Sequence, residues 1–181
     1  YQHILDHPQL RLVTISDPRF GGATQAAAAA EQEIASLIRR AGRGAYAKFD
    51  ELARQGVAAA GNDPQALLEL AARYPNADVI PSALLAAADA FEAAGQHRPA
   101  TRTLRLISHK YPDAVPKVRV LEAMARNYLA MPNRIEVAIS RLSQGVRIAG
   151  NPMLQQPLVL PDGTTIQGVS FTDAANALRE H

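Results

Sequence analysis

The chain has 181 residues, of which 48% are hydrophobic and 20% are charged, and its formal net charge at pH 7 is +2. These values fit one globular domain, or a large part of one, that can bury a real core. There is no cysteine, which excludes disulfides, thiolate metal sites, thiol catalysis and covalent c-type haem. No run of residues approaches the roughly 18 consecutive apolar residues of a membrane span, so we expect none.

The first 22 residues predict an irregular segment that contains one short strand. Residues 10–15 form a β-prone run between Pro8 and Pro18, which is typical of a strand. The pair Gly21-Gly22 then interrupts the chain. We therefore treat residues 1–22 as a separate N-terminal part.

Seven helices are predicted over residues 23–152. Thr24 caps a first helix over residues 25–41, and Gly42 ends it. The sequence Gly61-Asn62-Asp63-Pro64 supplies a stop, a cap and a first-turn proline before the third helix. The other helices are expected over residues 45–60, 64–74, 81–94, 99–111, 115–131 and 134–149. Because the loops between them are short, neighbouring helices should run antiparallel.

Residues 153–181 change character and predict a β-hairpin followed by a short helix. Residues 158–160 and 164–169 flank Pro161-Asp162-Gly163, an Asp-Gly turn signal. A helix is expected to follow from Phe171 to Leu178. Since a lone hairpin is marginal in water, it must pack on the helices, pair with residues 10–15, or join a sheet outside this chain.

Two matching segments reveal an internal repeat. Arg73-Tyr74-Pro75-Asn76-Ala77 recurs as Lys110-Tyr111-Pro112-Asp113-Ala114, about 37 residues later, and a period of about 20–50 residues indicates a repeat architecture. Between the two segments and after them, apolar and small residues recur at matching positions. One unit supplies Leu84, Ala87, Ala88, Phe91, Ala100, Leu104 and Pro112, and the next supplies Leu121, Met124, Ala125, Tyr128, Ala138, Leu142 and Pro152.

This pattern resembles the tetratricopeptide family over about residues 63–152. The period is a few residues longer than usual, Gln144-Gly145 stands where a small residue is expected, and the preceding unit matches only through Leu67, Leu70 and Pro75. The resemblance implies an all-α fold in which antiparallel helix pairs form a right-handed solenoid. The short N-terminal strand, the C-terminal hairpin and the last helix would flank it.

The resemblance also implies a groove, lined by the first helix of each unit, that receives a peptide or a partner helix. Its outward positions would be Ser82, Asp89 and Glu92 in one unit and Arg119, Glu122 and Arg126 in the next. The alternative is that these residues are solvated charges on amphipathic helices. Similar repeats stand beside β-propellers in exported bacterial proteins. Together with the start at Tyr1, which suggests a processed or excised piece, this favours export to the periplasm, while a cytoplasmic location stays open.

A basic stripe lies on one predicted helix. Residues 98–147 carry ten Lys and Arg against three Asp and Glu, and Arg98, Arg102, Arg105 and His109 fall on one side of the helix at 99–111. Such a stripe attracts acidic protein partners or the phosphates of nucleic acid, or is simply a solvated face. No aromatic side chain is interleaved for base stacking, which favours the protein partner.

No arrangement of residues indicates catalysis, a cofactor or a bound metal. Gly42-Arg43-Gly44-Ala45-Tyr46-Ala47 has the loose dinucleotide spacing, but a predicted helix precedes it where a strand is required. His3, Asp6 and His7 are a weak metal set near the terminus. The sequence therefore predicts a non-enzymatic interaction or scaffold module that binds a protein, a peptide or another domain of its own chain. The alternatives are a polyanion-binding module and an accessory domain of a larger exported enzyme or β-propeller protein.

Overall fold

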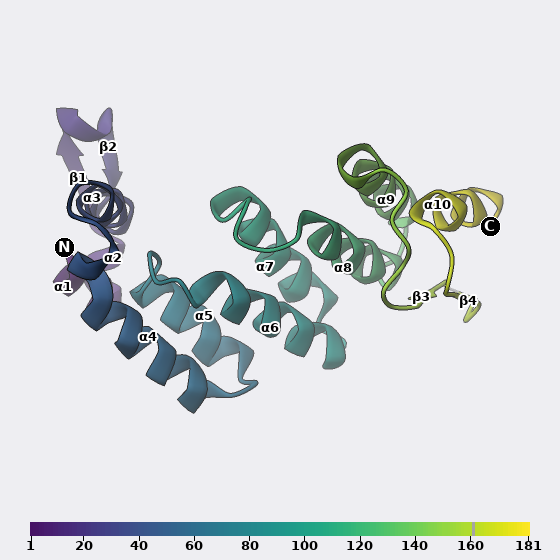
Figure 1. Cartoon of the computed structure of the whole chain (residues 1–181), viewed down its shortest axis with the longest axis horizontal. Coiled ribbons are helices and arrows are strands. Elements are labelled where there is room, and N and C mark those ends of the chain that lie inside the picture. Colours follow the sequence, from purple (N-terminus) through teal and green to yellow (C-terminus); the bar gives the residue numbers. More distant parts are fainter. Residues whose placement is uncertain (161) are drawn as a thin grey trace. The chain divides into compact units, whose positions relative to one another are not determined.

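The computed structural model describes residues 1–160 and 162–181 and is mostly helical (Figure 1). These residues form ten α-helices and two small antiparallel strand pairs. The chain divides into two compact units, Tyr1–Ala83 and Leu84–His181. The boundary falls within α6 (Ile80–Ala93), and each unit is described by itself.

The first unit begins with two short helices and a hairpin. α1 (Gln2–Asp6) and α2 (Pro8–Arg11) precede β1 (Thr14–Asp17), the 3₁₀ turn η1 (Pro18–Phe20) and β2 (Gly22–Gln25). The predicted strand at residues 10–15 is therefore wrong in its first half. Arg11 is helical because its guanidinium is buried, where it donates to the carbonyl of Leu5 at 2.6 Å and pairs with Glu69 at 2.7 Å.

The second strand of this hairpin was not predicted. β1 and β2 pair from Thr14 opposite Gln25 to Asp17 opposite Gly22. Gly21 and Gly22 have φ values of 77° and 117°, a conformation that glycine adopts without strain. The glycine pair therefore turns the chain back on itself, and the helix begins after Gln25 without the expected cap from Thr24.

Three longer helices complete the first unit, close to the predicted bounds. They are α3 (Ala26–Ala41), α4 (Ala47–Ala60), which follows the 3₁₀ turn η2 (Arg43–Tyr46), and α5 (Pro64–Arg73). Asp63 caps α5 by accepting hydrogen bonds from the backbone N–H groups of Gln65 and Ala66. The boundary predicted there is confirmed, and the segment with dinucleotide-like spacing is a helix–helix turn.

The second unit consists of the rest of α6 followed by α7 (His97–Lys110), α8 (Lys117–Leu129), α9 (Ile135–Ala149), β3 (Leu158–Val159), β4 (Thr165–Ile166) and α10 (Phe171–Glu180). α8 packs against α7 and α9, and α10 packs against α9. Tyr111 ends α7 as predicted, and in the first unit Tyr74 ends α5 in the same way.

The C-terminal hairpin forms within this chain and packs on the helices of its own unit. Among the described residues β3 pairs with β4 alone, and Leu158 lies opposite Ile166. In the expected turn, Pro161 lies outside the described residues, while Asp162 accepts from the N–H of Thr164 at 2.8 Å. The buried side chains of the tail join those of three helices in one core: Ala125, Leu129, Ala138, Ile139, Leu142, Leu154, Leu158, Leu160, Phe171, Ala174, Ala175 and Leu178.

These observations confirm a mostly helical fold with two small strand pairs. None of the described helices combines the length and apolar character needed to cross a membrane. The finer prediction, a tetratricopeptide-like solenoid, is taken up below as a proposal.

Candidate partner-binding site

The charges predicted to line a groove are paired with one another between α6 and α8. Arg119 of α8 lies 3.1 Å from Asp89 of α6. Two turns further along α8, Arg126 donates from Nε and Nη2 to the two carboxylate oxygens of Glu92, at 2.7 and 3.2 Å. Such bidentate, charge-assisted bonds are the stronger kind. The structure thus brings four of the six predicted groove positions together as two ion pairs.

A buried asparagine extends this cluster to α7. Asn127 of α8 is fully buried and donates from Nδ2 to Glu92 at 2.6 Å and to the carbonyl of Ala123 at 2.9 Å. Its Oδ1 lies 3.0 Å from Nδ1 of His97. Because the amide nitrogen is already committed as a donor, Oδ1 accepts and His97 carries a proton on Nδ1. Asn127 therefore holds α6, α7 and α8 in register.

The fifth predicted residue, Glu122, does not project outward. Its side chain is 1% exposed, and one carboxylate oxygen accepts from the backbone N–H groups of Gln155 and Gln156 at 2.8 and 2.7 Å. Arg126 lies 3.8 Å from the same oxygen. A buried charge needs such partners. The tail of the chain therefore covers Glu122, and the expectation of an exposed groove position there is wrong.

Ser82, the remaining groove position, is exposed and donates to the carbonyl of Val79 at 2.8 Å. It belongs to the first unit, whereas Asp89 and Glu92 belong to the second. The predicted groove charges are thus largely occupied by partners within the chain.

The basic stripe on α7 has the opposite character. Arg98, Arg102, Arg105 and His109 are all exposed. At 3.6 residues per turn they fall within an arc of about 60° and span about 16 Å of helix. No carboxylate of the described residues forms an ion pair with any of these four side chains. The positive charge of this stripe is therefore not neutralised by carboxylates of the described residues.

The buried side of α7 explains why these residues face outward. Ala100, Leu104 and Ile107 are fully buried. Two buried threonines satisfy their hydroxyls locally: Thr101 donates to the carbonyls of His97 and Arg98, and Thr103 donates to that of Pro99. The buried face of α7 is thus filled with apolar side chains and with threonines whose hydroxyls are hydrogen-bonded, so the arginine side chains lie on its solvent-exposed face.

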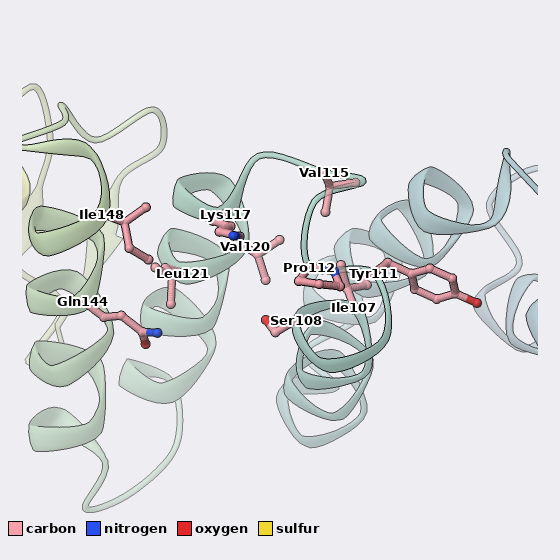
Figure 2. Close-up of a pocket in the computed structure, with 10 residues that line it drawn as sticks. All are labelled: Ile107, Ser108, Tyr111, Pro112, Val115, Lys117, Val120, Leu121, Gln144 and Ile148. Atoms are coloured by element: carbon pink, nitrogen blue, oxygen red, sulfur yellow. The ribbon is translucent and has the colours of Figure 1, made fainter. Parts of the chain in front are cut away.

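A cavity of about 240 Å³ opens where the C-terminal end of α7 meets α8 and α9. Figure 2 shows Leu121 and Val120 of α8 and Ile148 of α9 around the gap, while the ring of Tyr111 points away from it. The lining also includes Ile107, Ser108, Pro112, Val115, Lys117 and Gln144. None of the described residues that line it carries a carboxylate. Sequence reasoning missed this cavity because its walls come from three helices.

The described residues do not bring the predicted weak metal set together as a metal centre. No cluster of three or more potential ligands exists there. His7 Nδ1 is hydrogen-bonded to the carbonyl of His3 at 2.8 Å, and Asp6 accepts from Arg73 and Gln2. In the weak metal set, two of the three residues therefore already have other partners.

Sequence reasoning also missed Asn127 and His97. A signal was present, because Glu122, Arg126 and Asn127 interrupt the otherwise apolar run at residues 120–129, and a polar group buried there requires a partner. What the sequence did not show is which segment supplies that partner.

Comparisons with protein-family models, with curated proteins and with solved structures found no match to this chain.

Proposed function

We propose that this chain is a non-catalytic interaction module that binds an acidic protein partner through the basic stripe of α7. The observation that carries the proposal is the contrast between two sets of charges. The acidic and basic side chains of α6 and α8 neutralise one another, whereas Arg98, Arg102 and Arg105 have no carboxylate partner in the described part of the chain. Unpaired guanidinium groups favour bidentate contact with carboxylates.

The proposal includes a tetratricopeptide-like arrangement, in which α6 with α7 and α8 with α9 are successive helix pairs. Small residues at the positions of the repeat support it, since Ala87, Ala88, Ala100, Ala125 and Ala138 are at most 1% exposed. Small side chains let helices approach closely. In this proposal the module presents the outer face of α7, because the face on α8 that carries Glu122 is covered by the chain's own tail.

A protein partner fits the stripe better than a nucleic acid does. Phosphates would also bind four exposed basic groups, but single-strand binders add aromatic side chains on which bases stack. No aromatic residue lies between Arg98 and His109. A polyanion is therefore the second candidate, supported by the same unpaired arginines, and the experiment below separates the two.

The test compares binding of a labelled oligoglutamate peptide and of a single-stranded oligonucleotide of equal charge to the whole chain. We expect the peptide to bind with a salt-dependent affinity that falls in the double variant Arg102→Gln/Arg105→Gln. The matched control is Arg39→Gln/Arg40→Gln, which removes the same charge from α3. Equal loss in both double variants, or no binding of the peptide, contradicts the stripe. Tighter binding of the oligonucleotide supports the polyanion instead.

A further inference from the structure

The cavity at the end of α7 adjoins the basic stripe on the same helix. Ser108 lines the cavity, and Arg105 lies three residues earlier. Residues three apart are surface neighbours on a helix, so the rim of the cavity and the C-terminal half of the stripe are continuous. A segment bound along the stripe therefore reaches the cavity without leaving α7.

Most of the residues that line the cavity are apolar, and the cavity is partly open to solvent. Ile107, Val120 and Leu121 are buried at the base, while Ile148 is 48% exposed at the mouth. A dry cavity of about 150 Å³ lined by aliphatic side chains holds a benzene ring. The volume of about 240 Å³ is thus sufficient for one large aliphatic or aromatic side chain.

Lys117 is the one charged residue among the described residues that line the cavity. Its ammonium pairs with Asp113 at 3.0 Å, where both side chains are largely exposed and the pair contributes little. Gln144 lines it as well and accepts from Nη1 of Arg141 at 3.1 Å. The buried Nε of Arg141 has no hydrogen-bond partner among the described residues. Because the exposed pair with Asp113 contributes little, the Lys117 ammonium can also pair with a carboxylate next to the apolar group of an occupant.

We infer that the cavity is the anchor site for the acidic partner: a segment whose carboxylates lie along the α7 stripe and whose adjoining large apolar side chain enters the cavity. This inference rests on the proposed function and adds the partner's composition to it. The stripe spans about 16 Å, which equals about five residues of an extended chain at 3.3 Å each. The partner is thus a short acidic segment with an aromatic or aliphatic residue at one end.

The probes for the test are synthetic oligoglutamate peptides of about six residues that carry Phe or Ala at one end, in both orientations. Burial of a phenylalanine side chain should raise the affinity of one Phe peptide over its Ala counterpart by about tenfold or more. Ile148→Ala removes a wall of the cavity, and Ser108→Tyr introduces a bulky ring at its rim. Both should abolish this preference and leave the salt dependence unchanged. Leu106→Ala, which truncates an exposed leucine of α7 outside the cavity, is the matched control and should keep the preference.

Circular dichroism and thermal unfolding establish that each variant is folded; Ile148 and Ser108 are both exposed. If Phe and Ala peptides bind equally and both depend on Arg102 and Arg105, the anchor site is wrong and the proposed function stands. If neither peptide binds, the proposed function fails as well. A preference for Phe that persists in both Ile148→Ala and Ser108→Tyr would place the anchor elsewhere and overturn the inference.

Discussion

Two glycines inside helices show how single residues set the packing of this protein. A Cβ atom added at Gly145 of α9 would lie 2.6 Å from the ring of Phe171, whose side chain is fully buried. A Cβ atom added at Gly56 of α4 would lie equally close to a terminal methyl of Leu70, but that side chain is only partly buried. The rigid ring cannot yield, whereas the leucine methyl can.

Gly145→Ala should therefore destabilise the protein. Overpacking against the ring costs about 1–3 kcal/mol, and the helix propensity of alanine offsets about 1 kcal/mol of it. Gly56→Ala, the matched control, should be neutral or stabilising. Urea denaturation of both variants measures the difference in the free energy of unfolding. Equal stabilisation by the two substitutions would contradict the close contact of α9 and α10.

The carboxylate of Asp6 makes the stability of the first unit depend on pH in acid. Burial opposes ionisation of its carboxylate, but hydrogen bonds from Arg73 and Gln2 outweigh this and hold the pKa of Asp6 below its ordinary value of 3.8. A carboxylate with a lowered pKa binds protons more weakly in the folded state than in the unfolded state. Its stabilising contribution is therefore full at neutral pH and is lost as pH falls below 3.8 toward the lower folded pKa.

Asp6→Asn should remove this contribution, so that the stability of the variant and that of the wild type converge in acid. Thermal unfolding midpoints between pH ~7 and pH ~2 provide the measurement. Glu180→Gln, which changes an exposed carboxylate near the C-terminus, is the control and should leave the difference between neutral and acidic pH unchanged. A constant gap between Asp6→Asn and the wild type at every pH would contradict the assignment.

At the scale of elements, α8 depends on the tail that follows α9. Glu122 holds the backbone of Gln155 and Gln156, and beyond them Leu158 and Leu160 are buried in the C-terminal core. The carboxylate thus fixes the point at which the chain leaves α9 and returns to α8.

Glu122→Ala should release this segment, because it leaves two backbone N–H groups without their acceptor, at a cost on the order of 2–3 kcal/mol. Hydrogen exchange of the amides of Gln155 and Gln156 should become faster. Glu122→Gln retains an acceptor oxygen and should lose less. Unchanged exchange at these amides in Glu122→Ala would show that the tail is held by apolar packing alone.

The sequence was sufficient for elements whose signals are local. Gly42, Asp63-Pro64 and the two Tyr-Pro pairs each end or begin a helix near the predicted residue, because caps and breakers act within one turn. It was insufficient where distant segments meet. Arg11, which is helical, forms an ion pair with the distant Glu69. Glu122 is covered by residues more than thirty positions later in the chain. The cavity is formed by three helices. None of these follows from periodicity, since each depends on tertiary contacts.

At the scale of the whole molecule, charge is distributed unevenly. The second unit carries eleven Lys and Arg against eight Asp and Glu, while the first carries eight against nine. In the second unit, Asp89 and Glu92 are already committed to Arg119 and Arg126. Each of these pairs removes one charge of each sign, so the unit keeps its excess of three basic side chains.

The pairing of Asp89 with Arg119 has a consequence for kinetics. Long-range attraction between opposite charges raises the rate at which two molecules meet, and salt suppresses it. An ion pair produces little field at a distance, so Arg119 contributes little to this attraction while Asp89 is charged.

Asp89→Asn should leave Arg119 unneutralised and raise the association rate of an acidic peptide at low salt. The stability should change little, because both side chains are substantially exposed. Stopped-flow measurements at several salt concentrations test this, and an unchanged rate would contradict it. If the proposed function holds, the ion pairs between α6 and α8 slow the association with an acidic partner, because the charges that they neutralise no longer attract it from a distance.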